Sequence, residues 1–237
     1  GFFAPLRMTV QTQLINGESM IVISDMMGTL TTGSPVIGLV DWVHHNQSRR
    51  QAQLFTASIT PSYIAAKLGL IDWQKWAQRV MIDSLKLIRD ASPEKMKQVG
   101  EWAVEHNLWK KRRADVIARL TEHKSQGAQV YIASSVMEPL IEPFAQRIGV
   151  QTIGTAVEYQ NGNVRLSGGL VAQERKITEV LSRLGVKRVD FAYGDTIQDV
   201  PLLAHADHPV AVYPDAKLKE HALQHGWEIL GDRREEQ

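Results

Sequence analysis

Residues 20–31 read Met-Ile-Val-Ile-Ser-Asp-Met-Met-Gly-Thr-Leu-Thr, and the prediction of the fold starts from them. Its first four residues are apolar and rich in β-branched side chains, which predicts a short strand buried on both faces. The apolar run stops before Asp25, and Gly28 with Thr29 then indicates a turn. In open α/β sheets, ligands bind at the carboxyl edge of the strands, where this carboxylate would lie. The N–H groups of such a turn can hold an anion.

The second half of the chain alternates between strand and helix patterns. Strands are predicted at residues 128–133, 151–157, 188–193, 209–213 and 227–230, with helices at 137–148, at 173–184, after Asp195 and from Asp215. Asn161-Gly162 between two extended segments predicts a β-hairpin. Alternation of this kind predicts an α/β fold, a Rossmann-like parallel sheet with helices on both faces.

Residues 36–125 have almost entirely helical periodicity. Thr60-Pro61 and Ser92-Pro93 both resemble helix starts, with a capping hydroxyl before proline. Trp73, Trp76 and Trp102 are interpreted as core residues of this segment. The sequence therefore predicts a core domain of residues 19–33 and 126–237 with an inserted all-helical cap subdomain, residues 34–125. Residues 1–18 form a lead-in, and residues 1–7, ahead of Met8, are interpreted as an addition to the natural chain.

Composition excludes several classes of protein. Among 237 residues, 27 are Lys or Arg and 26 are Asp or Glu, so the net charge of +1 does not suggest a nucleic-acid partner. The basic run at residues 110–113 is interpreted as a solvated helix start. No cysteine is present, which excludes disulfides and thiolate chemistry and fits a cytoplasmic location. No apolar stretch reaches the roughly 18 residues of a membrane span, no signal peptide is visible, and no membrane partner is expected.

Three further stretches place polar side chains at strand ends or helix starts. Residues 130–135 form an apolar strand that ends in Ser134 and Ser135. Lys176 lies early in the helix predicted after the hairpin. Residues 193–203, Tyr-Gly-Asp-Thr-Ile-Gln-Asp-Val-Pro-Leu-Leu, place Asp195 and Asp199 four positions apart at a strand end. Two carboxylates in this arrangement suit Mg²⁺, which prefers hard oxygen ligands.

Together these motifs resemble the haloacid dehalogenase superfamily. Residues 25–31 resemble its first motif, Asp-x-Asp-Gly-Thr-(Leu/Val)-(Thr/Val), and residues 194–203 resemble Gly-Asp-(Ser/Thr)-x-x-Asp-x-x-(Met/Leu)-Leu. Ser134 and Lys176 stand where the superfamily places a hydroxyl and a lysine. The helical insertion after the first motif is similar to the cap of the phosphoserine-phosphatase-like branch. All four motifs occur in family order over residues 20–230.

The resemblance implies a Mg²⁺-dependent phosphohydrolase that acts on a small phosphorylated metabolite through an aspartyl-phosphate on Asp25. It implies that Asp25, the backbone carbonyl of Met27, Asp195 and Asp199 hold the metal. It also implies that Ser134 and Lys176 act on the phosphoryl group. Its oxygens would be bound as well by Ser135 and by the loop at Gly28 and Thr29. The oligomeric state is not readable from the sequence.

One position departs from the family pattern: Met27 replaces the second aspartate of the first motif. That residue normally protonates the leaving group, which a thioether cannot do. General acid–base catalysis typically contributes ~10²–10⁴ in rate, so the activity is expected to be attenuated or specialised. A pseudo-phosphatase that binds a phosphorylated ligand, and C–P or C–halogen cleavage, remain alternatives. Dehalogenation ranks last, because dehalogenases lack the motif kept at residues 194–199.

The substrate is the least determined feature. Phosphoserine phosphatases carry a glutamate nine residues after the nucleophile, where this chain has Ser34, which argues against phosphoserine. Arg49, Arg50 and Lys67 could meet an anionic substrate, although exposure to solvent is the better interpretation of each. The eight histidines show no convincing metal-binding spacing.

Overall fold

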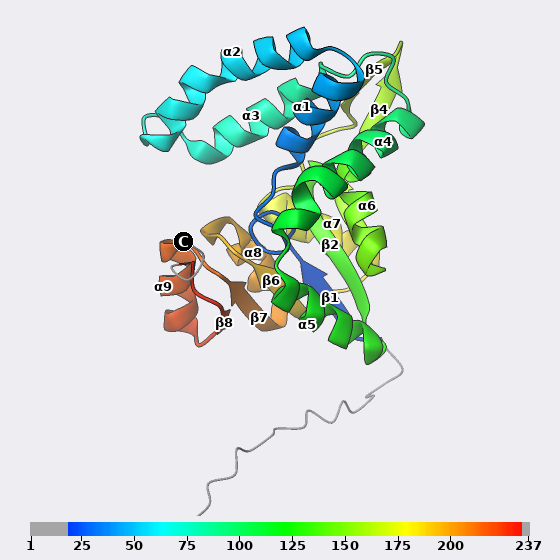
Figure 1. Cartoon of the computed structure of the whole chain (residues 1–237). Helices are drawn as coiled ribbons and strands as arrows, with labels where there is room; N and C mark the ends of the chain where they lie inside the picture. The colour runs from blue at the N-terminus through cyan, green and yellow to red at the C-terminus, as the bar shows by residue number, and fades with distance from the viewer. Residues whose placement is uncertain (1–18, 234–237) are drawn as a thin grey trace, which may run out of the picture.

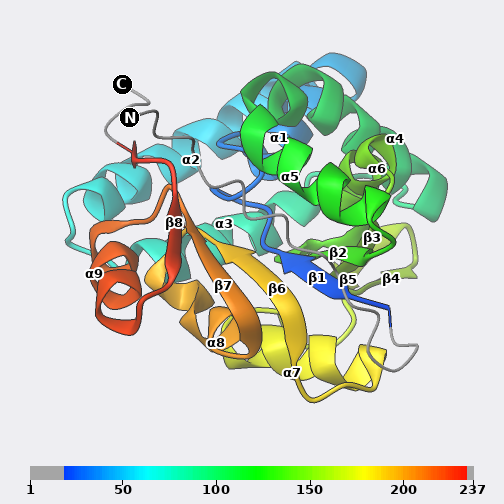
Figure 2. The same cartoon turned by 90° about the horizontal axis from the view of Figure 1, so that it is seen from below.

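A computed structural model of the chain describes residues 19–233. Six parallel strands form one sheet in the order β3-β2-β1-β6-β7-β8. Their bounds are β1 Ile21–Ser24, β2 Gln129–Met137, β3 Gln151–Thr155, β6 Val189–Gly194, β7 Ala206–Val212 and β8 Glu228–Leu230. The predicted lead-in, residues 1–18, lies outside the described residues. Figures 1 and 2 show the sheet between its helices, with β1 near the centre.

Helices cover both faces of the sheet because alternate strand residues enter two separate cores. Val22 of β1 belongs to the core under α5 Ala114–Ser125 and α6 Glu138–Ile148. Ile23 belongs to the core under α7 Glu174–Leu184, α8 Val200–Leu203 and α9 Ala216–His225. The buried apolar strands and the helices on opposite faces confirm the predicted α/β fold. No helix within residues 19–233 has the length and apolar character needed to cross a membrane.

The segment between β1 and β2 is helical, as predicted. It comprises α1 Pro35–Asn46, α2 Arg49–Lys67, α3 Trp73–Leu85, α4 Pro93–Ala103, the π-helical turn η1 Val104–Leu108, the 3₁₀ turn η2 Trp109–Lys111 and α5. In Figure 1, α1, α2 and α3 lie beyond the end of the sheet, whereas α5 lies beside β1 and β2. A separate two-stranded hairpin, β4 Val157–Gln160 and β5 Asn163–Leu166, turns at Asn161-Gly162 as predicted. The domain boundaries at residues 34 and 125 stay a prediction.

Thr60-Pro61 does not start a helix, so that prediction was wrong. Helix α2 begins after Ser48, whose hydroxyl accepts the N–H of Gln51, and runs through Pro61 to Lys67. Pro61 cannot donate the usual bond to the residue four positions before it. The Thr60 hydroxyl donates to the Thr56 carbonyl at 2.7 Å, which is a common mid-helix role for threonine. The second prediction of this kind is confirmed, because Ser92 caps α4 before Pro93.

Two other interpretations of the helical segment need correction. Trp73 is 42% exposed rather than part of a core, because it lies at the exposed turn that connects α2 to α3. The basic run at residues 110–113 is solvated only in part. The Arg113 side chain is buried, and its guanidinium lies 3.8 Å from the centre of the Tyr213 ring. The ring therefore takes the place of solvent beside the planar guanidinium, in a cation–π contact.

Candidate active site

The loop after β1 is folded tightly around a glycine. The Asp25 N–H donates to the Tyr193 carbonyl at 2.9 Å, which continues the pairing of β1 with β6 by one residue. The Leu30 N–H returns to the Met26 carbonyl at 2.9 Å, and the Gly28 N–H donates to the Thr31 carbonyl at 2.8 Å. Gly28 has a φ of +86°, and a Cβ there would lie 2.1 Å from an Asp195 carboxylate oxygen. Only glycine fits this position.

Three aspartates meet at the carboxyl edge of the sheet. Asp25 follows β1, Asp195 follows β6, and Asp199 ends the 3₁₀ turn η3 Ile197–Asp199. All three are buried, and an oxygen of each lies within 4.8 Å of an oxygen of the other two. Asp199 is fixed by a capping box, because its Oδ2 accepts the Thr196 N–H and hydroxyl, both at 3.2 Å. Neighbouring parallel strands bring together carboxylates that are 170 residues apart in sequence.

Lys176 is the buried cation of this cluster. It reaches in from the first turn of α7, and its Nζ lies 2.6 Å from Asp25 Oδ1 and 2.8 Å from Asp199 Oδ1. Its pKa is raised even though burial alone would lower it, because two carboxylates face the ammonium group. Lys176 therefore stays charged and links the first motif to the last.

The carboxylates carry more negative charge than Lys176 balances. Burial raises the pKa of Asp25 from 3.8 to about 6, against the opposing effect of Lys176. Burial raises the pKa of Asp195 well above its usual range, and the charges of Asp25 and Asp199 add to that rise. An additional cation close to these three groups would relieve the repulsion.

Two contacts with Asp195 were not predicted from the sequence. The Thr29 hydroxyl donates to Asp195 Oδ1 at 3.2 Å, so the Thr29 side chain helps to hold this carboxylate in place. The Arg233 guanidinium donates to Asp195 Oδ2, to the Asp195 carbonyl at 3.1 Å and to the Tyr213 carbonyl at 2.5 Å. Thr29 belongs to the motif at residues 25–31, whereas no sequence pattern around Arg233 indicated that it would contact the site. Only the pairing of β8 beside β7 brings Arg233 to this edge.

Ser134 and Ser135 lie in β2 at the same edge of the sheet. Ile132 pairs with Ser24, the last residue of β1, so the two serines extend beyond the end of that strand. Ser134 is buried, and its hydroxyl accepts the Val136 N–H at 3.4 Å. The Ser135 carbonyl accepts the Thr155 hydroxyl at 2.8 Å. The strand register supports a location near Asp25, and their roles stay predictions.

Met27 occupies the position two residues after Asp25. Its side chain is half-buried and packs against the larger apolar core. Its backbone forms a bridge with Thr31, whose hydroxyl donates to the Leu108 carbonyl at 2.7 Å. The loop is therefore attached to the end of η1, and its second position carries an apolar, non-titratable side chain.

The other candidate residues of the helical segment do not reach the carboxylates. Ser34 is the N-cap of α1, with its hydroxyl 3.4 Å from the Ile37 nitrogen. Arg49, Arg50 and Lys67 are exposed on α2, as the interpretation of each as a solvated side chain requires. The Lys67 ammonium lies 5.0 Å from the centre of the Trp73 ring.

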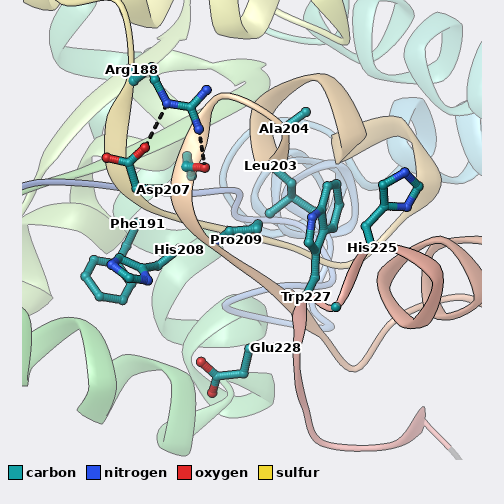
Figure 3. Close-up of a pocket in the computed structure, with 12 residues that line it drawn as sticks. Arg188, Phe191, Leu203, Ala204, Asp207, His208, Pro209, His225, Trp227 and Glu228 are labelled. Carbon is teal, nitrogen blue, oxygen red and sulfur yellow. Dashed lines mark hydrogen bonds and ion pairs between the residues drawn. The ribbon is translucent and has the colours of Figure 1, made fainter.

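A cavity lies at the opposite end of the sheet from the carboxylates. Its volume is about 600 Å³. It lies where β6, β7 and β8 begin and is lined by Phe191, His208 and Trp227 among others (Figure 3). Arg188 donates there to Asp207 Oδ1 and to the Ala206 carbonyl, both at 2.8 Å. The amino ends of parallel strands do not carry the motif residues, so this cavity is separate from the carboxylate site.

The residues present fit a divalent cation. Asp25, Asp195 and Asp199 offer convergent carboxylate oxygens, which are the ligands that hard cations prefer. Burial is the main cause of the raised pKa values of Asp25 and Asp195, and the neighbouring carboxylates add to the rise, which a cation bound among them would oppose.

The fold and this cluster define an α/β protein whose reactive groups lie at the carboxyl edge of a parallel sheet. The chain belongs to the family described as haloacid dehalogenase-like hydrolases, whose model matches residues 22–204. That range includes Asp25, Lys176, Asp195 and Asp199.

Individual relatives agree with the family. A phosphoserine phosphatase of Mycobacterium tuberculosis is 34% identical over 115 residues, which are 45% of this chain and 37% of that protein. A histidinol-phosphatase of Neisseria meningitidis is 32% identical over 120 residues, 46% of this chain and 54% of that protein. The matches therefore span about half or less of each relative.

Solved structures share the fold. A Bordetella pertussis protein of unknown function superposes with a TM-score of 0.70 and 20% identity, covering 90% of this chain and 98% of that one. A substrate-bound phosphoserine phosphatase superposes with a TM-score of 0.59 and 15% identity, covering 92% and 96%. At these identities the likeness concerns the fold.

Proposed function

We propose that this chain is a Mg²⁺-dependent phosphohydrolase that cleaves a small phosphorylated metabolite through an aspartyl-phosphate on Asp25. The observation that carries the proposal is the contact of Lys176 with both Asp25 and Asp199, beside Asp195. A buried nucleophilic carboxylate, an adjacent cation and two further carboxylates are what phosphoryl transfer to an aspartate requires. The phosphatases among the relatives support the same class of substrate.

Asp25 performs the bond-forming step in this proposal. One of its carboxylate oxygens attacks phosphorus, an O–P bond forms, and the bond from phosphorus to the leaving oxygen breaks. The leaving oxygen keeps the bonding electron pair and takes a proton from solvent. Water then attacks the same phosphorus, the P–O bond to Asp25 breaks, and Asp25 leaves as a carboxylate while the proton of the water passes to solvent. Attack requires ionised Asp25, which Lys176 favours by its positive charge at 2.6 Å.

The remaining residues bind and orient. Asp25, Asp195, Asp199 and the Met27 carbonyl would hold Mg²⁺, which when bound neutralises charge on the transferring phosphoryl group. Ser134 and Ser135 are proposed to donate to phosphoryl oxygens from the end of β2. The Gly28 N–H donates to the Thr31 carbonyl, so the Thr29 N–H is the proposed donor from that loop. Arg233 orients Asp195 by donating to its carbonyl and to its carboxylate.

Met27 favours a specialised reaction. With no carboxyl group at this position, leaving groups that depart without a proton, such as aryl and acyl phosphates, should react best. The same observation favours a second candidate, a pseudo-phosphatase that binds a phosphorylated ligand without cleaving it. Cleavage of a C–P or C–halogen bond is a third candidate function. The presence of Asp195 and Asp199 weighs against C–halogen cleavage.

A panel of phosphate esters assayed with Mg²⁺ and with a chelator tests the proposal. Aryl and acyl phosphates should be hydrolysed only with Mg²⁺, and alkyl phosphates much more slowly. Asp25→Asn and Asp195→Asn should abolish turnover, whereas Asp207→Asn, a matched change at an exposed aspartate in β7, should not. Zero turnover across the panel, together with tight binding of a phosphorylated ligand, would establish the pseudo-phosphatase instead.

A further inference from the structure

Helix α2 carries two apolar faces on opposite sides. One face packs on its neighbours through buried or half-buried residues, which are Ala52, Phe55, Ile59, Ser62 and Ala66. The other face consists of Leu54, Ala57, Pro61, Ile64 and Leu68, which recur every three or four residues and are all exposed. We call these five residues the outer stripe. Figure 1 shows α2 at the edge of the molecule, with α3 on its inner side.

The outer stripe is strongly exposed. Leu54 is 62% exposed, Ile64 51% and Leu68 69%. Beyond Leu68 the connection to α3 adds Leu70, Ile71 and Trp73, which are also exposed. Single exposed leucines are normal on protein surfaces, but a continuous run along one helix and its turn marks an interaction surface.

The charges beside the outer stripe are almost all positive. Residues 49–79 contain five exposed basic side chains, Arg49, Arg50, Lys67, Lys75 and Arg79, and one acidic residue, Asp72. Of the five, Arg79 pairs with Asp83 of the same helix at 3.8 Å. This segment has a net charge of +4 in a chain whose total is +1. Asp72 is occupied as the N-cap of α3, where its Oδ1 accepts the Lys75 N–H at 2.8 Å. A partner for this surface should be both anionic and apolar.

A second copy of the chain does not meet that requirement. Helix α2 has no acidic residue, with Arg49 and Arg50 at its start and Lys67 at its end. If two outer stripes packed antiparallel, the arginines of one copy would approach Lys67 of the other. If they packed parallel, the four arginines would approach one another. Either pairing places like charges together without compensation.

The aromatic residues at the turn favour a lipid surface. Tyr63, Trp73 and Trp76 cluster with ring centres 5.0 to 6.0 Å apart, and the Lys67 ammonium lies over the Trp73 ring. Tryptophan and tyrosine are enriched at membrane–water interfaces, and lysine extends its ammonium group toward headgroups from an apolar stem. The outer stripe of α2 has basic residues at both ends, Arg49 and Arg50 at its start and Lys67 near its end, and an exposed apolar helix face with basic flanks can lie in a membrane interface.

We infer that the outer stripe of α2 and the turn after it adsorb to the surface of an anionic phospholipid membrane. The apolar residues enter the headgroup boundary, and the basic residues of α2, which are Arg49, Arg50 and Lys67, contact lipid phosphates. The absence of a spanning segment from the sequence concerns only insertion across a bilayer, so it does not bear on adsorption. The inference is independent of the proposed reaction.

Sedimentation of the full chain with lipid vesicles tests the inference. The protein should bind vesicles of phosphatidylglycerol mixed with phosphatidylcholine at least ~10-fold more strongly than phosphatidylcholine alone, and added salt should weaken binding. Leu68→Asp should abolish binding. Leu223→Asp is the matched control, because Leu223 on α9 is 68% exposed and lies outside the outer stripe.

A second pair of variants separates charge from apolar contact. Arg50→Gln with Lys67→Gln should weaken binding to anionic vesicles roughly 30-fold. Lys187→Gln with Lys217→Gln removes the same charge from exposed positions elsewhere and should change it little. Ile64→Gln repeats the apolar test if Leu68→Asp does not fold.

Four results would overturn the inference. These are no binding to anionic vesicles, equal binding to both lipid compositions, or an equal loss in Leu223→Asp. The fourth is a dimer in light scattering that Leu68→Asp dissociates, which would mean that a second copy covers this face.

Discussion

Charged side chains are usually exposed and apolar side chains are usually buried. The carboxyl edge of the sheet and the outer stripe of α2 depart from this rule in opposite ways. At the sheet edge, charged side chains are buried, and each has a partner: Lys176 for Asp25 and Asp199, and Arg233 for Asp195. On α2, apolar side chains are exposed. Buried charges are tolerated only while their partners remain, whereas exposed apolar groups cost the folded state little. Substitutions should therefore have large effects in the first region and small effects on folding in the second.

The largest change is expected at Met27. Met27→Asp should supply the proton that alkyl leaving groups need and raise their turnover by ~10²–10⁴, equivalent to roughly 2.7–5.5 kcal/mol of barrier. Aryl phosphates should gain less in the first step, because their leaving groups need little help. Steady-state rates on one alkyl and one aryl ester measure the difference.

Met27→Leu is the control for this prediction, since it keeps the packing against the core and adds no proton donor. It should leave both rates near those of the parent. If neither Met27→Asp nor Met27→Glu accelerates alkyl-phosphate cleavage in folded protein, the missing carboxyl group does not limit the reaction. The pseudo-phosphatase then becomes the better description.

Lys176→Met should cause the largest loss of folding free energy. It leaves Asp25 and Asp199 buried without their shared cation, which typically costs about 3–5 kcal/mol. Urea unfolding at neutral pH in the presence of a chelator measures the loss. Lys187→Met, at an exposed lysine, should change the unfolding free energy by less than about 0.5 kcal/mol. Equal losses in the two variants would contradict the compensation assigned to Lys176.

Asp25→Asn should stabilise the metal-free protein at pH 7. The folded state raises the pKa of Asp25 from 3.8 to about 6, so it binds this proton more tightly than the unfolded state. Ionisation of Asp25 therefore lowers stability as the pH rises from about 4 to above 6. Asparagine does not ionise, and its advantage should reach roughly 2–3 kcal/mol at pH 7 and vanish below about pH 4.

Urea unfolding at several pH values, with a chelator present, measures this difference. Added Mg²⁺ should reduce it by compensating the carboxylate. A constant difference between pH 4 and pH 7 would mean that Asp25 does not titrate with a raised pKa.

The smallest effects on folding should occur along the outer stripe. Ile64→Gln and Leu68→Gln should each change the unfolding free energy by no more than about 0.5 kcal/mol, because both side chains are mostly exposed. Leu39→Gln in α1 is the contrast, since Leu39 is completely buried. Large losses in both stripe variants would show that these side chains are covered in the folded protein.

The sequence predicted the fold well because its strongest signals are local. Apolar strands that end in Asp25 and Gly194, and Asn161-Gly162 between extended segments, depend on neighbouring residues alone. Parallel strands share one carboxyl edge, so the pattern of strands was enough to predict that Asp25, Asp195 and Asp199 converge. Lys176 could be expected there only through the family resemblance.

The features that the sequence did not predict depend on tertiary context. Arg233 reaches Asp195 only because β8 ends beside β7, and a lone arginine carries no local pattern. Pro61 indicates a helix start by propensity, but the packing of α2 on α1 and α3 carries the helix through it. The exposure of Trp73 could not be expected either, because tryptophan spacing is the same for a packed and an unpacked face.

Gly28 affects how sequence variation in this loop should be interpreted. A side chain there would collide with Asp195 and would require a left-handed backbone, whatever reaction the protein performs. A library of variants selected only for correct folding would therefore retain glycine at this position. Invariance of Gly28 among variants would report steric exclusion rather than selection for catalysis. Position 27 has no such restriction, so the residues tolerated there are the ones that would reveal which reaction has been selected.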